Sequence, residues 1–283
     1  MRRRWRRCAR SGHSKDVVRE IYFEGDGFEV PLLTSAVLPE RFRHGFTTRV
    51  GGVSAAPFDT LNLGGRWGDR REDVLENRRR VQLAAGGQAI FFATQVHGRE
   101  VARVEQGTTP DGLMAIDADA VFTTLPEVPV GVYVADCVPI LVADERTGAC
   151  AAVHAGWRGT VAGVLAAAVA RLVADAGARA ADLRVAIGPS IGPCCFEVGP
   201  EVVAAVEAAF PAARAAGAIL ERSPRPHVDL PRLNRMAAEG AGVSPDAIDV
   251  AGLCTSCDRG RFYSYRRDHG RTGQLAAFVV RRG

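Results

Sequence analysis

Short segments of apolar and β-branched residues, each bounded by Gly, Pro or Asp, limit the possible folds of this chain most strongly. Such segments are typical of buried β-strands. The first three follow one another closely, with the hairpin sequence DERTG joining the second and third, and a long helical segment precedes the fourth. Because this order mixes antiparallel and parallel pairing, we predict an α/β fold with mixed sheets rather than a doubly wound fold. The predicted strands are 129–136, 139–144, 149–154, 183–188, 248–253 and 274–281.

Three helices are predicted, at about 70–84, 160–177 and 200–210. In the second, apolar residues recur three and four positions apart, with Thr160 available as the N-cap and Gly177 as the C-cap. The third opens with a proline in its first turn, and Pro211 is expected to end it.

Length and charge exclude several classes of protein. The 283 residues, 47% of them hydrophobic, suffice for one large domain or two modest ones, and no apolar run approaches the ~18 residues of a membrane span. The net charge is +4, but residues 1–20 alone carry +6, which leaves −2 for the rest. We therefore expect no nucleic-acid or membrane partner.

Residues 1–20 are predicted to be a disordered basic tail, and 21–283 the folded domain. Since no apolar segment of a signal peptide follows the tail, we expect a cytoplasmic protein.

His97, Cys137 and His154 are the main candidates for chemistry. Each lies at the end of an apolar segment, and glycines follow both histidines closely, which lets a ligand approach the backbone. Two imidazoles and a thiolate form a three-ligand set that suits zinc and leaves its fourth position open for water. Such a zinc lowers the pKa of its bound water towards ~7. The spacings of 40 and 17 residues fix no geometry by themselves, so the residues alone also allow a buried thiol with two structural histidines.

Seven cysteines, an odd number in a chain this large, favour reduced thiols over a disulfide framework. The one C-x-x-C, Cys254–Cys257, could be half a zinc site or a redox pair. No second C-x-x-C accompanies it, and the pair Cys194–Cys195 is vicinal. We interpret these four as structural thiols.

Several known catalytic motifs are absent from the sequence. It contains no H-x-H pairs, which multicopper oxidases need in number, and none of the H-x-E, H-E-x-x-H, Walker A or G-x-S-x-G motifs. Zinc-assisted chemistry in this chain would therefore use a different set of residues.

The chain strongly resembles the bacterial laccase-domain family, whose members are also called polyphenol oxidases, multifunctional purine nucleoside enzymes or peptidoglycan editing factors. The matching segments occur in the family's order and cover nearly everything but the tail. They are HGFTTRVGGVS (44–54), LNLGGRWGD (61–69), VLENRRRV (74–81), TQVHG (94–98), DADAVFT (117–123), ADCVPILVAD (135–144), AVHAGWRGT (152–160), AIGPSIGPCCFEVG (186–199) and CTSCDRGRFYSYRRDHGRTG (254–273).

The resemblance implies a single domain with mixed β-sheets sandwiched between helical layers (α/β/β/α). It also implies that His97, Cys137 and His154 are the metal ligands and the catalytic centre, with zinc as the cofactor and copper possible. The implied activities are phosphorolysis of adenosine, inosine, guanosine and methylthioadenosine to base and pentose 1-phosphate, and hydrolytic deamination of adenosine. The implied partners are therefore purine nucleosides and phosphate. The sequence does not determine the oligomeric state, and we favour a monomer.

Phosphorolysis calls for donors that hold an anion beside C1′ of the sugar. Arg49, Arg158 and Arg266 lie in the matching segments and are the candidates. One departure is local: after SYRRD the family usually reads T-G-R, whereas this chain has Gln274, and Arg271 is a candidate substitute. A proton shuttle for deamination is not evident, because Asp136 would point away from Cys137 in a strand.

Three alternatives remain open. The first is a hydrolase in which Cys137 is the nucleophile and His154 the base, acting on a cell-wall peptide or another amide. The second is copper-dependent phenol oxidation. The third is a metal-stabilised protein that acts through a partner and is not an enzyme.

Overall fold

All six segments predicted as strands contain strands in the computed structural model, which describes residues 4–7 and 18–283. They belong to two six-stranded sheets. The sheet that contains residues 139–154 mixes parallel and antiparallel pairs, as predicted, whereas every strand pair in the other sheet is antiparallel. In order across the first sheet lie β1 (Arg4–Arg7), β2 (Val18–Gly25), β3 (Phe28–Ser35), β4 (Phe42–Thr47), β14 (Leu275–Arg281) and β7 (Val130–Val134). In order across the second lie β13 (Ile248–Val250), β10 (Arg184–Ile187), β8 (Val138–Ala143), β9 (Cys150–Ala155), β6 (Ala120–Thr123) and β5 (Val101–Val104).

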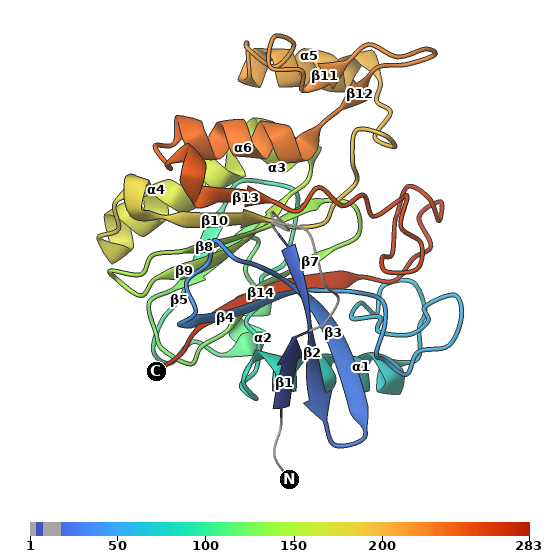
Figure 1. Ribbon diagram of the computed structural model, residues 1–283, viewed down its shortest axis with the longest axis vertical. Coiled ribbons are helices and arrows are strands. Elements are labelled where there is room, and N and C mark those ends of the chain that lie inside the picture. Colours follow the sequence, from blue (N-terminus) through green and yellow to red (C-terminus); the bar gives the residue numbers. More distant parts are fainter. Residues whose placement is uncertain (1–3, 8–17) are drawn as a thin grey trace.

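The two sheets stack between two helical layers, which confirms the predicted α/β/β/α arrangement (Figure 1). Helices α3 (Trp157–Ala162), α4 (Val164–Ala176) and α6 (Leu230–Gly240) cover the second sheet, and α1 (Arg71–Ala85) packs on the first. The short α2 (Pro110–Met114) lies near α1, whereas α5 (Pro200–Ala209) and the small sheet of β11 (Ile219–Leu220) and β12 (His227–Val228) lie beyond α6.

Three apolar clusters fill the spaces between these layers. One lies between α4, α6 and the second sheet, one between the two sheets, and one between the first sheet and α1. Strands β8 and β9, joined by the predicted turn after Asp144, are buried at every residue. These two strands therefore lie in the core of the molecule, and their packing positions the loops at their ends.

The helix predicted at 160–177 is wrong as a single element, because it is two helices, α3 and α4, separated by Gly163. Gly163 has a φ of 81°, in the left-handed region that glycine adopts at no steric cost. Thr160, predicted as the N-cap, instead lies buried inside α3, where its hydroxyl accepts a hydrogen bond from Asn234 at 3.0 Å. The break lets α3 begin directly after β9.

The described part of the segment predicted as a tail differs from that expectation. Arg4–Arg7 form β1, which pairs antiparallel with β2, and β2 begins at Val18. The prediction of disorder for residues 1–20 is therefore wrong for 4–7 and 18–20, and otherwise lies outside the described residues. Two hydrogen-bonded strands place these residues at the edge of the first sheet.

The described residues include no helix that is long and apolar enough to cross a membrane.

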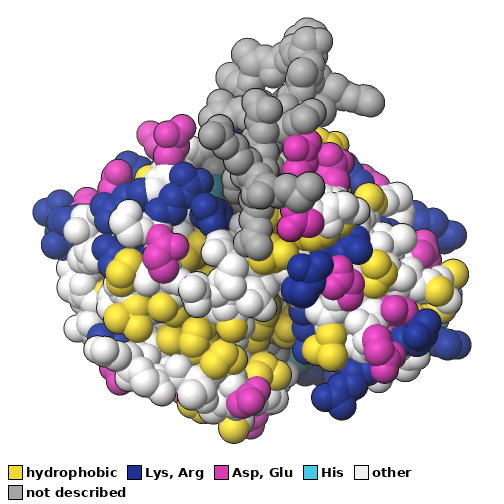
Figure 2. Space-filling view, turned by 90° about the horizontal axis from the view of Figure 1, so that it is seen from below, with side chains coloured by type: hydrophobic (Ala, Val, Ile, Leu, Met, Phe, Trp, Pro, Cys, Tyr) yellow, Lys and Arg dark blue, Asp and Glu magenta, His cyan; other side chains and the backbone are white. Residues whose placement is uncertain are grey.

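Arginines and acidic side chains are interspersed around a hydrophobic area on the face drawn in Figure 2. No large basic area covers the described part of this face.

Candidate metal centre

The structure brings together the three predicted ligands, His97, Cys137 and His154. His97 lies in the loop before β5, Cys137 in the connection from β7 to β8, and His154 in β9. One ligand atom from each residue lies within 4.8 Å of the other two. Cys137 Sγ is 3.8 Å from His97 Nε2, and the two imidazole rings meet edge to face with their centroids 4.9 Å apart. Three segments far apart in the sequence thus converge on one point.

Asp119, which the sequence analysis did not single out, shapes this centre. Its carboxylate accepts hydrogen bonds from the backbone N–H groups of Val96, His97 and Gly98 at 2.7–3.1 Å. It also bonds to Nδ1 of His154 at 2.7 Å. These bonds hold the loop in which His97 adopts a φ of 61°, a conformation that costs energy for a non-glycine residue. The signal in the sequence was an acidic residue directly before the apolar run Ala120–Phe122, which begins β6.

The charge balance at this centre favours a thiolate. Burial opposes ionisation of Cys137, but the neighbouring His154 and His97 outweigh it and lower the pKa of the thiol to about 6. Burial likewise disfavours the charged form of His154, but Cys137 and Asp119 outweigh it and raise the pKa of the imidazole to about 9. For Asp119, hydrogen bonds from His154 and the loop outweigh burial and keep the pKa of the carboxyl below its usual value.

These donors fit a zinc ion. Tetrahedral Zn–S and Zn–N bonds separate sulfur and nitrogen by about 3.6 Å, close to the observed 3.8 Å. The bond from Nδ1 to Asp119 orients His154 and leaves Nε2 for a metal, an arrangement common around ligating histidines. Three protein ligands leave the fourth position for water or substrate, which is typical of a catalytic site.

Gly156→Ala is expected to weaken metal binding by about 10- to 100-fold, the range typical of changes beside a metal ligand. A Cβ there would lie 2.8 Å from His97 Cδ2 and 3.0 Å from Cys137 Sγ, so both ligands would have to move. The backbone of Gly156, at a φ of −67°, accommodates alanine without strain. Metal titration of the purified variant measures the effect. Gly240→Ala, where a Cβ meets nothing within 4 Å, is the matched control. Equal affinity in the Gly156 and Gly240 variants would contradict the close packing of the triad.

The triad opens into a cavity of about 540 Å³, within the size range of small-molecule sites. Aromatic side chains contribute much of its lining, and three arginines add positive charge. Sequence reasoning had selected Arg158 and Arg266 but had missed Arg66 and the aromatic residues. The aromatic lining residues are Trp67, Tyr133, Trp157, Phe196 and Tyr265.

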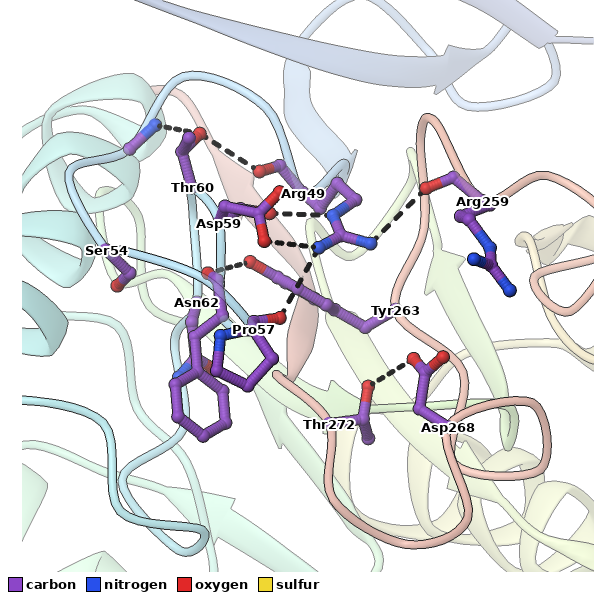
Figure 3. A network of polar contacts seen from close by, with 12 residues as sticks. Arg49, Ser54, Pro57, Asp59, Thr60, Asn62, Arg259, Tyr263, Asp268 and Thr272 are labelled. Carbon is purple, nitrogen blue, oxygen red and sulfur yellow. Dashed lines mark hydrogen bonds and ion pairs between the residues drawn. The ribbon is translucent and has the colours of Figure 1, made fainter.

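Arg49 does not line this cavity but a separate one of about 520 Å³ (Figure 3). Its guanidinium pairs with the Asp59 carboxylate at 3.1 Å, donates to the Asp59 carbonyl at 2.7 Å, and lies over the Tyr263 ring. Arg271 lines the same separate cavity, whereas Gln274 lines the cavity with the triad. The suggestion that Arg271 replaces the arginine absent at position 274 is therefore wrong, because the two side chains belong to different cavities.

Asp136 connects two segments that line the cavity through hydrogen bonds. Its carboxylate accepts hydrogen bonds from the hydroxyls of Thr255 and Ser264 and from the backbone N–H of Arg266, at 2.6–3.0 Å. These contacts fix the loop that carries Cys137 against the segment that carries Arg266. The prediction that Asp136 lies in a strand and points away from Cys137 is wrong, because β7 ends at Val134 and Asp136, at a φ of 86°, lines the cavity.

Comparison with known proteins agrees with this architecture. Residues 43–282 match the model of the family described as multi-copper polyphenol oxidoreductase laccase. A purine nucleoside phosphorylase of Deinococcus radiodurans is 42% identical over 83% of this chain and 88% of its own. Purine nucleoside phosphorylase PA4543 of Pseudomonas aeruginosa is 42% identical over 85% of this chain and 94% of its own. The crystal structure of YlmD from Geobacillus stearothermophilus superposes with a TM-score of 0.83, at 34% identity, over 95% of this chain and all of that one. The chain belongs to this laccase-domain family.

Proposed function

We propose that the chain is a zinc-dependent purine nucleoside phosphorylase whose active site is the cavity at His97, Cys137 and His154. Adenosine, inosine, guanosine and methylthioadenosine are the proposed substrates, and base and pentose 1-phosphate the products. Deamination of adenosine to inosine is the second proposed activity of the same site. The observation that carries the proposal is the opening of the metal-ligand set into an aromatic, arginine-lined cavity. The names of the relatives support the same substrate class.

The aromatic lining suits a purine base, since a flat ring system gains most from stacking against aromatic faces. Tyr133 and Trp157 belong to different elements that line the cavity, β7 and the start of α3. Tyr133 is itself stacked on Phe92, with ring centroids 4.0 Å apart, so its ring is held in place. A rigid aromatic wall orients the nucleoside before reaction.

Phosphorolysis requires an anionic nucleophile held beside C1′ as positive charge develops on the sugar. Arg158 is the better candidate for this role, because its exposed side chain lies over the Trp157 ring at the cavity. The Nη1 atom of Arg266 already donates to the carbonyls of Cys195 and Glu197, at 3.3 and 2.9 Å. Arg266 thus has fewer donors left for phosphate. Arg49, bound within the other cavity, is not assigned to phosphate.

A zinc ion at the triad would supply a Lewis acid and would lower the pKa of bound water to about 7. The protein's own contribution is to keep Cys137 as a thiolate and, through Asp119, to fix the orientation of His154 and the loop of His97. Purified protein incubated with adenosine or inosine, with and without phosphate, tests the proposal. Release of hypoxanthine from inosine should depend on phosphate, whereas conversion of adenosine to inosine should not. Base release independent of phosphate would indicate a hydrolase instead.

Arg158→Ala is expected to slow phosphorolysis by about 10- to 150-fold and to raise the phosphate requirement, because a charge-assisted contact contributes about 1.5–3 kcal/mol. Deamination should be largely spared, since it consumes no phosphate. Kinetics of both reactions at varied phosphate measure the separation. Arg235→Ala, on α6, paired with Glu239 and not among the residues that line the cavity, is the control. Equal damage to both reactions would place Arg158 at the nucleoside rather than at phosphate.

A second candidate is a Cys-His hydrolase. Cys137 has a lowered pKa and lies beside His154, which bonds to Asp119. In such a hydrolase Cys137 would be the nucleophile, His154 the base and Asp119 the acidic residue that orients the base. The two functions differ in their response to metal. A thiol alkylator inactivates such a hydrolase while a chelator leaves it active, whereas the zinc enzyme loses activity on chelation.

A further inference from the structure

The structure gathers four cysteines into a second cluster. One Sγ atom from each of Cys194, Cys195, Cys254 and Cys257 lies within 4.8 Å of the other three. The Cys257 sulfur is 3.5 Å from that of Cys194 and 3.4 Å from that of Cys195. The first two cysteines lie in the loop between β10 and α5, and the other two between β13 and β14. The sequence had shown only one C-x-x-C, and the fold supplies its partner as a vicinal pair.

We propose that these four thiols form a second metal site, a closed tetrahedral zinc site with a structural role. Four thiolates are the donor set of structural zinc, with every coordination position filled by protein. Zn–S bonds of 2.3 Å place tetrahedral sulfurs about 3.8 Å apart, between the short observed separations and the 4.8 Å limit. The cluster lies outside the proposed active site, since among the described residues that line its cavity Cys137 is the single cysteine.

Gly192 lies directly against the four-cysteine cluster and leaves room for its sulfur atoms. Gly192 donates its backbone N–H to Cys254 Sγ at 3.3 Å, a contact that orients and stabilises a thiolate ligand. A Cβ at Gly192 would lie 3.2 Å from Cys254 Cβ and 3.3 Å from Cys194 Sγ, so a side chain there would press on the cluster. Cys194 and Cys257 are exposed, which gives an ion a path of entry.

The two cysteine loops also carry the wall of the main cavity. Ile191 and Phe196 flank Cys194 and Cys195, and Arg266 lies in the same connection between β13 and β14 as the other two cysteines. Besides the cluster, the loops are joined by backbone bonds between Ser190 and its partners Leu253 and Thr255. A zinc ion bound by both cysteine pairs would link residues more than sixty positions apart in the chain. It would thereby hold the two loops that line the cavity in place relative to each other.

Metal analysis of the whole 283-residue chain tests the proposal without an activity assay. Protein purified under reducing conditions and equilibrated with zinc should lose one zinc per chain on the double substitution Cys254→Ser/Cys257→Ser, whatever the triad binds. Cys150→Ala, a buried thiol in β9 outside both clusters, should lose none. His97→Ala should keep the zinc at the four cysteines, so failure of the triad and failure of this site are distinguishable. Unchanged zinc in the double variant overturns the proposal.

A measurement on the unsubstituted chain covers the case in which the double variant does not fold. With zinc bound, Cys194 and Cys257 should react slowly with an alkylating agent, and a chelator should speed their reaction despite their exposure. Cobalt loaded into the His97→Ala variant should give the strong absorption bands of a tetrahedral thiolate site. Alkylation at one rate with and without chelator, or a disulfide among the four found in the denatured, unreduced protein, would refute a metal site.

Discussion

Cys137→Ala, His97→Ala and His154→Ala are each expected to lose the metal of the main centre and to abolish phosphorolysis and deamination together. A three-ligand site deprived of one ligand loses a direct bond to the ion, so metal affinity should fall by more than the 10–100-fold typical of changes to the groups that hydrogen-bond to the ligands. His154→Ala additionally leaves Asp119 as a buried carboxylate without its imidazole partner. Zinc content and turnover of both reactions, measured on the same preparations, check the result.

Cys150→Ala is the control for the triad variants, because it removes a buried thiol that lies outside the metal centre. It should retain zinc and both activities. Because the four-cysteine cluster is expected to hold its own ion, each triad variant should lose part of its zinc and keep the rest. Full activity in Cys137→Ala would show that another thiol performs the chemistry.

Asp119→Asn is expected to have the second largest effect. The substitution preserves volume but places an amide, with two donors, among three backbone N–H groups that need an acceptor. Unsatisfied buried donors cost about 1–3 kcal/mol in the free energy of unfolding. The loop of His97 and the orientation of His154 should loosen together, and zinc affinity should fall by about 10- to 100-fold. Thermal unfolding and metal titration measure the two effects.

The pH dependence of the melting temperature distinguishes the effect of the negative charge of Asp119 from the effect of its side-chain shape. The pKa of this carboxyl is lowered in the folded protein, so its contribution is present above the unfolded pKa of about 3.9 and is lost as pH falls through the folded value. The difference in melting temperature between the protein and Asp119→Asn should therefore shrink only at strongly acidic pH. Asp175→Asn, at an exposed ion pair on α4, is the control and should change neither melting temperature nor metal binding. A metal affinity of Asp119→Asn equal to that of this control would refute the positioning role.

Patterns local to the chain predicted much of the scaffold. Short apolar runs located the strands that became β7–β10, β13 and β14, because these segments, except for the partly buried β13, are largely buried on both faces. They missed β2 and β3, in which charged residues such as Glu20, Glu24 and Glu29 interrupt the pattern. The break at Gly163 was also missed, because an apolar repeat continues across it and only the backbone conformation ends the first helix.

The sequence by itself determined the mixed-sheet class of the fold, the hairpin after Asp144, and the residue types that make a metal ligand set of His97, Cys137 and His154. Only the tertiary structure decided which distant loops meet. It brought the Asp119 carboxylate within hydrogen-bond distance of the His97 backbone and the His154 ring. It placed Arg158 and Arg266 at the main cavity and Arg49 at another. It also brought the two cysteine pairs together. The physical reason is that a spacing along the chain fixes geometry only over one turn or one hairpin. Beyond that range, the packing of the two sheets sets the distances.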